Sequence, residues 1–314
     1  MWALRQPAPY EFERIEVPDP DPADLPPGRV LVRFRLGGIC GSDLPPFAGV
    51  RDVGFPHTGT VGAPLHEIVG DVVASADDRL RRGERVVGKV STSDGLREVV
   101  VARAELLHPL ADALSDGEAI VAQPLATVLC ALDRVGALPG RRAAVLGLGP
   151  IGMLFGAALK ERGYHVTGVD RVDRTAVAAV FGIDEPVVAQ TREWAAGLSD
   201  DRPDLVVDAI GHSQDVLADC VEAARTHGEV YVFGLPEEHY VLPMRRFFDK
   251  MLVLRAGATT NWPAHLAAAE RFLLDHRDLA AAYVTDTYPM AEAKEAYLSA
   301  LRPAVGRLKI ALVP

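Results

Sequence analysis

The segment Gly147-Leu-Gly-Pro-Ile-Gly152 constrains the fold of this chain more than any other feature. It follows the apolar run AAVL and opens IGMLFGAALKERG, whose apolar residues have helical spacing. In such a strand–turn–helix unit the first glycine permits the tight turn, the second lets the backbone approach a pyrophosphate, and the third lets helix and strand pack closely. The free N–H groups of the helix then face the phosphates. We therefore expect Gly147, Gly149, Pro150, Ile151 and Gly152 to bind a dinucleotide.

The next apolar run, HVTGVD, ends in Asp170. A carboxylate about twenty residues after the glycines accepts hydrogen bonds from the adenosine ribose. Asp170 would repel a 2′-phosphate, whereas Arg171 and Arg174 could hold one. The sequence thus favours NAD and leaves NADP open.

The fold class follows from the order of the apolar runs. From Arg142 onward, runs typical of strands alternate with helical patterns, which indicates an α/β domain with a doubly wound parallel (Rossmann) sheet over residues 138–262. Residues 1–137 read as short strands and Pro/Gly loops up to GEAIVAQPLATVLCALDRVGAL, which has helical spacing. We expect a mostly β domain there, completed by residues 263–314, because the nucleotide-binding sheet is already complete without them.

Composition limits the partners. The 314 residues carry a formal charge of −10, so no overall positive field holds nucleic acid. The longest uncharged stretch, residues 143–159, is broken by glycines and a proline, so we expect no membrane span. The first residues do not have the pattern of a signal peptide. Three widely spaced cysteines without a CxxC pair favour the reducing cytoplasm.

A second constellation contains zinc ligand types. Gly38-Ile-Cys40-Gly-Ser42-Asp43 follows a predicted strand, and Leu65-His66-Glu67 begins the next one. A thiolate, an imidazole and a carboxylate could thus converge from two loops. We expect Asp43 to be structural and to fix the Cys40 loop through backbone N–H groups.

Together these segments resemble the zinc-dependent medium-chain dehydrogenase/reductase family over nearly the whole chain. The resemblance implies a GroES-like β domain, a Rossmann domain and a catalytic zinc held by Cys40, His66, Glu67 and Gln123, the last in the matching segment AQPLA. The Ser42 hydroxyl would pass a proton from the substrate. Asn261 resembles an asparagine that aldose dehydrogenases place near the nicotinamide.

The resemblance implies an NAD(P)-dependent alcohol dehydrogenase that transfers hydride between the nicotinamide and a secondary alcohol or ketone. The match is best with the glucose, aldose and polyol enzymes, so we expect a sugar, polyol or cyclitol-like substrate. Two anionic and two neutral ligands would make the zinc site formally neutral, but Glu67 could also stand behind the metal. Relatives pair through edge strands, which predicts a homodimer or homotetramer involving EVYVFG or MLVLRAGA.

Three departures keep other functions open. Pro45 and Pro46 stand where relatives carry a proton-relay histidine, Leu65 replaces a glycine, and the cysteine-rich structural zinc lobe is absent. A zinc-free medium-chain reductase of quinones or enones is therefore an alternative. A non-catalytic NAD(H)-binding protein is another.

Overall fold

The computed structural model describes residues 1–51, 54–138, 140–211 and 213–314, and the chain divides into two compact units. Unit 1 comprises residues 1–126, 261–303 and 307–314, and unit 2 comprises residues 127–260 and 304–306. The division falls within helix α3 (Ala122–Leu132), earlier than the boundary after residue 137 that the sequence suggested.

Unit 2 contains a six-stranded sheet in the order β10-β9-β8-β11-β12-β13, with every pair parallel. This is the doubly wound order in which the carboxyl ends of the central strands bind a dinucleotide. Strands β8, β11 and β12 are almost continuously buried, as expected for a sheet covered on both faces. The strands are β8 (Arg142–Leu146), β9 (His165–Asp170), β10 (Glu185–Val188), β11 (Leu205–Asp208), β12 (Glu229–Val232) and β13 (Val253–Ala256).

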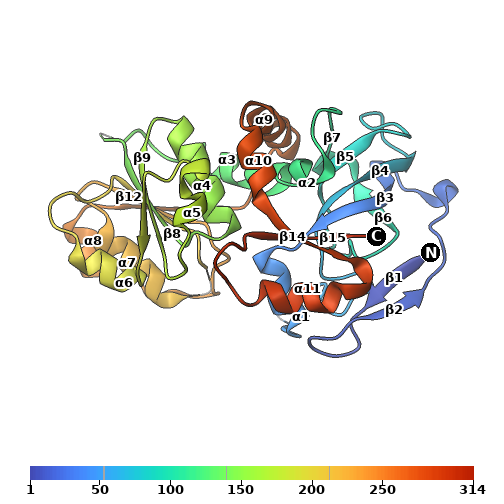
Figure 1. Ribbon diagram of the computed structural model, residues 1–314, viewed down its shortest axis with the longest axis horizontal. Helices are drawn as coiled ribbons and strands as arrows, with labels where there is room; N and C mark the ends of the chain where they lie inside the picture. The colour runs from blue at the N-terminus through green and yellow to red at the C-terminus, as the bar shows by residue number, and fades with distance from the viewer. Residues whose placement is uncertain (52–53, 139, 212) are drawn as a thin grey trace. The chain divides into compact units, whose positions relative to one another are not determined.

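Helices connect these strands and cover the sheet (Figure 1). Helix α4 buries eight of its twelve residues, and Gly156 lets Ile183 and the backbone of Phe181 approach it closely. The helices of unit 2 are α4 (Pro150–Glu161), α5 (Thr175–Ala178), α6 (Thr191–Gly197), α7 (Gln214–Ala223) and α8 (Met244–Asp249), with a 3₁₀ turn η4 (Ala179–Phe181).

Unit 1 is built on a sheet in the order β14-β15-β3-β4-β5-β7, with β6 also paired to β3. Its core lies between this sheet and α11, where apolar side chains of β3, β4, β15 and α11 pack together. The strands are β3 (Arg29–Gly38), β4 (Glu67–Ser75), β5 (Arg85–Lys89), β6 (Val99–Arg103), β7 (Leu107–Pro109), β14 (Val284–Pro289) and β15 (Lys309–Val313), beside a separate hairpin of β1 (Trp2–Arg5) and β2 (Glu13–Glu16).

The C-terminal segment completes unit 1, as the sequence predicts. Strand β15 pairs antiparallel with β3, and β14 adds to β15 in parallel, so the red strands of Figure 1 continue the blue sheet. The helices of this unit are α1 (Leu44–Phe47), α2 (Asp116–Ala119), the start of α3, α9 (Trp262–Asp275), α10 (Arg277–Tyr283) and α11 (Ala293–Ala300), with 3₁₀ turns η1 (Pro22–Asp24), η2 (Gly41–Asp43), η3 (Ala104–Leu106) and η5 (Met290–Glu292).

The predicted helix over residues 117–138 is two helices instead. Ser115 and Glu118 form a capping box that starts α2. Pro124 lacks the N–H that a continuous helix would direct at Ile120, so α3 starts anew at Ala122. It ends at Leu132, short of the expected end.

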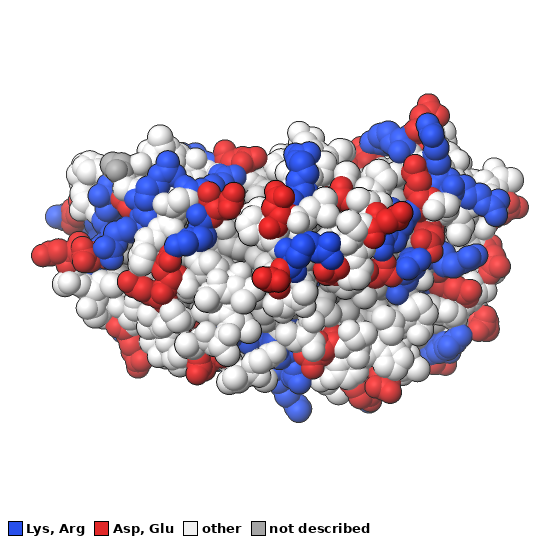
Figure 2. Space-filling model, turned by 45° about the horizontal axis from the view of Figure 1, so that its top comes forward, with Lys and Arg blue, Asp and Glu red and all other residues white. Residues whose placement is uncertain are grey.

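Acidic and basic side chains intermingle on the face of the molecule that Figure 2 shows. Among the described residues, no helix combines the length and apolar character needed to span a bilayer.

Candidate functional site

The loop after β3 presents Cys40. Asp43, in the turn η2, is buried, and its Oδ2 accepts a hydrogen bond from the Cys40 backbone N–H at 2.9 Å. This confirms the expected structural role of Asp43. The bond closes the loop and fixes the direction of the thiol.

His66 and Glu67 reach the same end of the sheet from the start of β4. Strands β3 and β4 are antiparallel, and Gly38 pairs with Glu67. Cys40 lies two residues beyond Gly38, and His66 immediately precedes Glu67. Strand register therefore brings together residues that the sequence separates.

The Cys40, His66 and Glu67 side chains each offer a ligand atom, and these atoms lie within 4.8 Å of one another. The Nδ1 of His66 lies 2.8 Å from Asp43 Oδ1, which leaves Nε2 for a metal. Thiolate, imidazole and carboxylate are the donors that zinc binds. The residues present therefore fit a zinc ion.

The charges around His66 favour its protonated form without a metal. Burial alone lowers the pKa of His66, but the charges of Asp43 and Cys40 and the hydrogen bonds to them outweigh burial and raise this pKa well above the ordinary value. A cation is thus attracted to the site, and metal binding would displace a proton.

Two buried tyrosines border the same group. Burial raises the pKa of Tyr283 well above its ordinary value, and the charges of Glu67 and Cys40 raise it further. Burial and the charges of Asp43, Cys40 and Glu67 do the same for Tyr297, whose hydroxyl donates to the Pro64 carbonyl. Both phenols therefore stay protonated.

Glu67 has a partner that the sequence analysis did not single out. Lys309, the first residue of β15, places Nζ 2.7 Å from Oε1 and 2.6 Å from Oε2 of Glu67. The sequence does contain a sign of this pair, because Lys309 is the only charged residue in the apolar run LKIALV. A lysine predicted to lie inside a core strand requires a buried partner.

The other expected site residues of unit 1 lie as follows. Gln123, in the first turn of α3, is 3% exposed, and Ile120, three residues earlier, packs against Gly38. Ser42 is half-buried in η2. Asn261 is exposed, and its carbonyl accepts hydrogen bonds from His265 at the start of α9. The roles of Gln123, Ser42 and Asn261 stay predictions.

In unit 2, the glycine-rich turn has the geometry that a pyrophosphate site requires. Gly147 has φ of +92°, and a Cβ on Gly152 would collide with the Gly147 carbonyl. A Cβ on Gly149 would meet no atom within 4 Å, so the space beside it is open. Pro150 and Ile151 form the first turn of α4.

The Asp170 carboxylate is fixed at the end of β9. Its Oδ2 accepts from the Leu148 N–H at 2.7 Å, and its Oδ1 accepts from the Val172 N–H at 2.8 Å. Arg171 is exposed. Arg174, by contrast, is 5% exposed and donates to the Ala304 carbonyl, and burial lowers its pKa. Arg174 is therefore committed to the interior, contrary to its expected availability for a 2′-phosphate.

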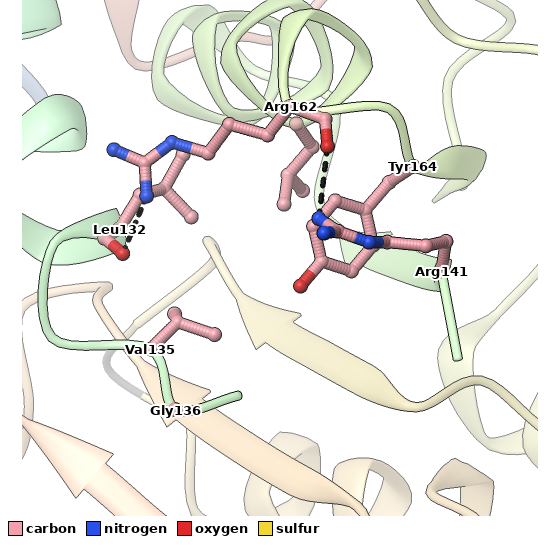
Figure 3. Close-up of a pocket in the computed structure, with 7 residues that line it drawn as sticks. Leu132, Val135, Gly136, Arg141, Arg162 and Tyr164 are labelled. Atoms are coloured by element: carbon pink, nitrogen blue, oxygen red, sulfur yellow. Dashed lines mark hydrogen bonds between the residues drawn. The ribbon is translucent and has the colours of Figure 1, made fainter. Parts of the chain in front are cut away.

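A cavity of about 300 Å³ in unit 2 contains none of these residues. Its arginines cap helix ends, since Arg162 donates to the Leu132 carbonyl at the end of α3, and Arg141 donates to the Arg162 carbonyl at the end of α4 (Figure 3). The cavity is thus a packing feature beside two helix ends. It is lined by Leu132, Val135, Gly136, Arg141, Leu159, Arg162 and Tyr164.

A doubly wound sheet with a glycine-rich turn, joined in one chain to a unit that gathers cysteine, histidine and glutamate, is the architecture of a nicotinamide-dependent oxidoreductase. Comparison with known proteins gives the particular family. The model of the alcohol dehydrogenase GroES-like domain matches residues 26–153, and that of the zinc-binding dehydrogenase domain matches residues 150–275.

Individual relatives agree with this assignment. The chain is 26% identical to L-arabinitol 4-dehydrogenase from Talaromyces emersonii, covering 93% of this chain and 86% of that protein. It is 27% identical to D-altritol 5-dehydrogenase from Agrobacterium fabrum, covering 86% of this chain and 88% of that protein. The solved structure of alcohol dehydrogenase TADH from Thermus sp. ATN1 superposes with a TM-score of 0.84 at 25% identity, covering all of both chains. The chain belongs to the zinc-type medium-chain alcohol dehydrogenase family and is an NAD(P)-dependent alcohol dehydrogenase.

Proposed function

We propose that this enzyme oxidises a secondary alcohol of a polyol or sugar-like substrate, or reduces the matching ketone, at a zinc site formed by Cys40, His66, Glu67 and Gln123. The observation that carries the proposal is the convergence of Cys40, His66 and Glu67, with Asp43 orienting the imidazole. The reaction moves a hydride between the substrate carbon and the nicotinamide and a proton to or from solvent.

Each side chain has a distinct task. A bound zinc supplies Lewis acidity, which lowers the pKa of a substrate hydroxyl. Cys40 supplies negative charge, and His66 supplies a neutral nitrogen held by Asp43. Ser42 accepts the proton of the substrate hydroxyl while passing its own proton outward.

The substrate class rests on the relatives. Those described above act on arabinitol and altritol, and another, sorbitol dehydrogenase from Bombyx mori, is 27% identical. In sequence, Gln123 and Asn261 resemble residues that aldose and polyol enzymes use. A polyol is therefore the substrate class to test first.

NAD is the proposed cofactor. Asp170 is fixed at the end of β9, where a carboxylate would accept hydrogen bonds from the ribose hydroxyls. The inward position of Arg174 removes one of two cations that could favour a 2′-phosphate. Arg171 remains exposed, so NADP use depends on that residue.

We also propose a homodimer formed through β13. This edge strand exposes Val253 and Leu254, and Phe248 in the neighbouring α8 is 71% exposed. An exposed apolar edge strand pairs readily with another strand, and a second copy supplies one. A reducing cytoplasm suits the protein, because Cys40 forms no disulfide and must stay reduced to bind zinc.

Zinc content and turnover test the function. Protein purified without chelator should hold zinc and oxidise arabinitol, altritol or sorbitol with NAD⁺. Cys40→Ala should lose both the zinc and the turnover. Removing a residue that only supports a metal ligand lowers activity by up to ~100-fold, so the loss of a ligand itself should lower kcat/KM by more than that.

Cys130→Ala is the matched control. Cys130 is buried in unit 2 and contacts Thr260, so this variant should keep zinc and turnover. Full turnover by metal-free wild type would reject the zinc site in favour of a zinc-free reductase. Cofactor binding without turnover on any alcohol or ketone would reject the polyol proposal.

A further inference from the structure

Tyr297 lies in the core of unit 1 and contacts both segments that carry the proposed metal ligands. It belongs to α11 and is fully buried. Its ring centroid lies 4.9 Å from that of Phe47, and its hydroxyl donates a hydrogen bond to the Pro64 carbonyl. Phe47 ends the segment that begins at Cys40, which we call the Cys40 loop (residues 40–47). Pro64 belongs to the segment that leads to His66, which we call the His66 loop (residues 63–66).

The ring of Tyr297 holds the far end of the Cys40 loop. Cys40 is the N-cap of the 3₁₀ turn η2, and η2 leads directly into α1, which ends at Phe47. Phe12 packs on both rings, with its centroid 5.1 Å from that of Phe47 and 5.1 Å from that of Tyr297. Because the backbone between Cys40 and Phe47 is helical throughout, the position of this aromatic cluster helps to fix the position of Cys40.

The hydroxyl of Tyr297 acts on the His66 loop. Pro64 is buried, and a buried carbonyl needs a donor, which the phenol supplies. Burial raises the pKa of Tyr297 well above its ordinary value, so the phenol keeps the proton that it donates. Leu65, the next residue, is fully buried in the same core, and its N–H donates to the Ser93 carbonyl at 2.8 Å.

Packing alone does not account for a tyrosine at this position. A phenylalanine would make the same ring contacts, whereas a hydroxyl in an apolar core is unfavourable unless it finds a partner. What the hydroxyl adds is one directional bond to the His66 loop. Since the ring contacts the Cys40 loop, a single side chain joins the two loops.

We propose that Tyr297 is a positioning residue that holds the Cys40 and His66 loops together, so that the zinc site is formed before the ion binds. The inference rests on the proposed function, because it concerns the same site. Asp43 joins the two loops through the His66 side chain, whereas Tyr297 joins them through the backbone at Pro64. Without the Tyr297 hydroxyl, the His66 loop can shift in the zinc-free protein, and zinc binding must then order it.

Tyr297→Phe tests this role, because it keeps the ring and removes only the hydroxyl. We expect the variant to bind zinc about fivefold more weakly than wild type, which is the effect of one net hydrogen bond on an equilibrium constant. Titration of the purified, zinc-loaded enzyme with a competing chelator measures this affinity.

A second measurement separates positioning from a purely structural role. If the hydroxyl only stabilised unit 1, Tyr297→Phe would lower the melting temperatures of zinc-loaded and zinc-free protein by similar amounts. If the hydroxyl positions the loops, zinc should raise the melting temperature of the variant by less than that of wild type, because a weaker ligand stabilises less.

Tyr288→Phe is the matched control. The Tyr288 hydroxyl lies 3.2 Å from Ser299 Oγ of α11, and its side chain packs against the same core. This variant also removes one tyrosine hydroxyl from unit 1 but leaves the bond to Pro64 intact. It should bind zinc as wild type does.

The outcomes separate the two proposals. Wild-type zinc affinity and a wild-type rise in melting temperature with zinc in Tyr297→Phe would overturn the role of Tyr297. An equal loss of affinity in Tyr288→Phe would also overturn it, because the bond to Pro64 would then have no particular effect. A wild type that holds no zinc would overturn the zinc site itself, and the role of Tyr297 with it.

Discussion

Asp43 shows how one residue can fix two groups that are far apart in the chain. Its two carboxylate oxygens bond the Cys40 backbone and the His66 ring, so it fixes both the loop and the imidazole. The sequence predicted the first bond, because Asp43 and Cys40 are neighbours. The second bond depends on the register of β3 and β4.

Asp170 carries the residue-scale prediction for the cofactor. Asp170→Ser removes the carboxylate that would bond the ribose hydroxyls. Hydrogen bonds to charged groups contribute about 1.5–3 kcal/mol, so KM for NAD⁺ should rise about tenfold or more and the preference should move toward NADP⁺.

Steady-state kinetics with both cofactors measures this change. Asp173→Ser is the control, since Asp173 accepts from the Thr175 N–H and is an exposed aspartate of the same loop. Equal NAD⁺ kinetics for Asp170→Ser and wild type would refute the assignment of Asp170.

At the scale of elements, the helix termini of unit 2 depend on particular residues. In the turn between β8 and α4, Gly152 is required for packing, whereas Gly149 leaves space open. The end of α7 is capped by the buried Lys250.

Gly152→Ala should lower stability, whereas Gly149→Ala should weaken NADH binding. The Cβ of the first collides with the Gly147 carbonyl, so we expect a loss of about 1–3 kcal/mol in the free energy of unfolding. The second meets no atom within 4 Å and should melt like wild type, yet bind NADH more weakly. Thermal melts and NADH fluorescence titrations distinguish the two, and a Gly149→Ala variant with wild-type NADH affinity would contradict the pyrophosphate site.

Lys250 carries a prediction for pH. Its Nζ donates to the carbonyls of Val221 at 2.9 Å and Ala224 at 2.8 Å, and also to that of Glu222. Burial lowers the pKa of Lys250 from 10.5 to about 8. Lys250→Met should lower the free energy of unfolding by about 1–3 kcal/mol, because it leaves buried carbonyl acceptors without a donor.

The sign of the pH dependence follows from linkage. Between pH 8 and 10.5 the unfolded chain keeps the Lys250 proton and the folded chain does not, so the contribution of Lys250 to stability rises with pH in that window. Urea denaturation from pH 7 to 10 should show wild type gaining stability relative to Lys250→Met. A constant difference would contradict the lowered pKa.

At the scale of the whole molecule, the chain leaves unit 1 within α3, forms the nucleotide unit, and returns to add α9, α10, α11, β14 and β15. Its last strand supplies Lys309, so the buried Glu67 of unit 1 has its cationic partner only when the C-terminal strand is in place. The two edges of the nucleotide-binding sheet differ, since β13 combines exposed apolar residues with an exposed α8.

Leu254→Lys should convert the proposed dimer into a monomer, because two lysines would face each other where β13 strands pair. Analytical ultracentrifugation measures the change. Val188→Lys, on the opposite edge strand β10, is the control and should remain dimeric. Dissociation by the control alone would place the interface at the other edge.

The sequence by itself determined the two-part fold, the glycine-rich turn and the kinds of side chain that could hold a metal. These features depend on the periodicity of apolar residues and on motifs whose residues lie a few positions apart. Both can be read from a short segment of sequence. Even so, the break before Gln123 was missed, because apolar residues continue at helical spacing across it, whereas Pro124 has no N–H to donate to Ile120.

Tertiary structure alone decided which charges meet. Lys309 and Glu67 are 242 residues apart, and Arg174 turns toward Ala304, 130 residues away. Such contacts depend on strand register and on the return of the chain, and local sequence contains neither. A buried charge is stable only beside its partner, so the fold had to be known before the tasks of these residues could be assigned.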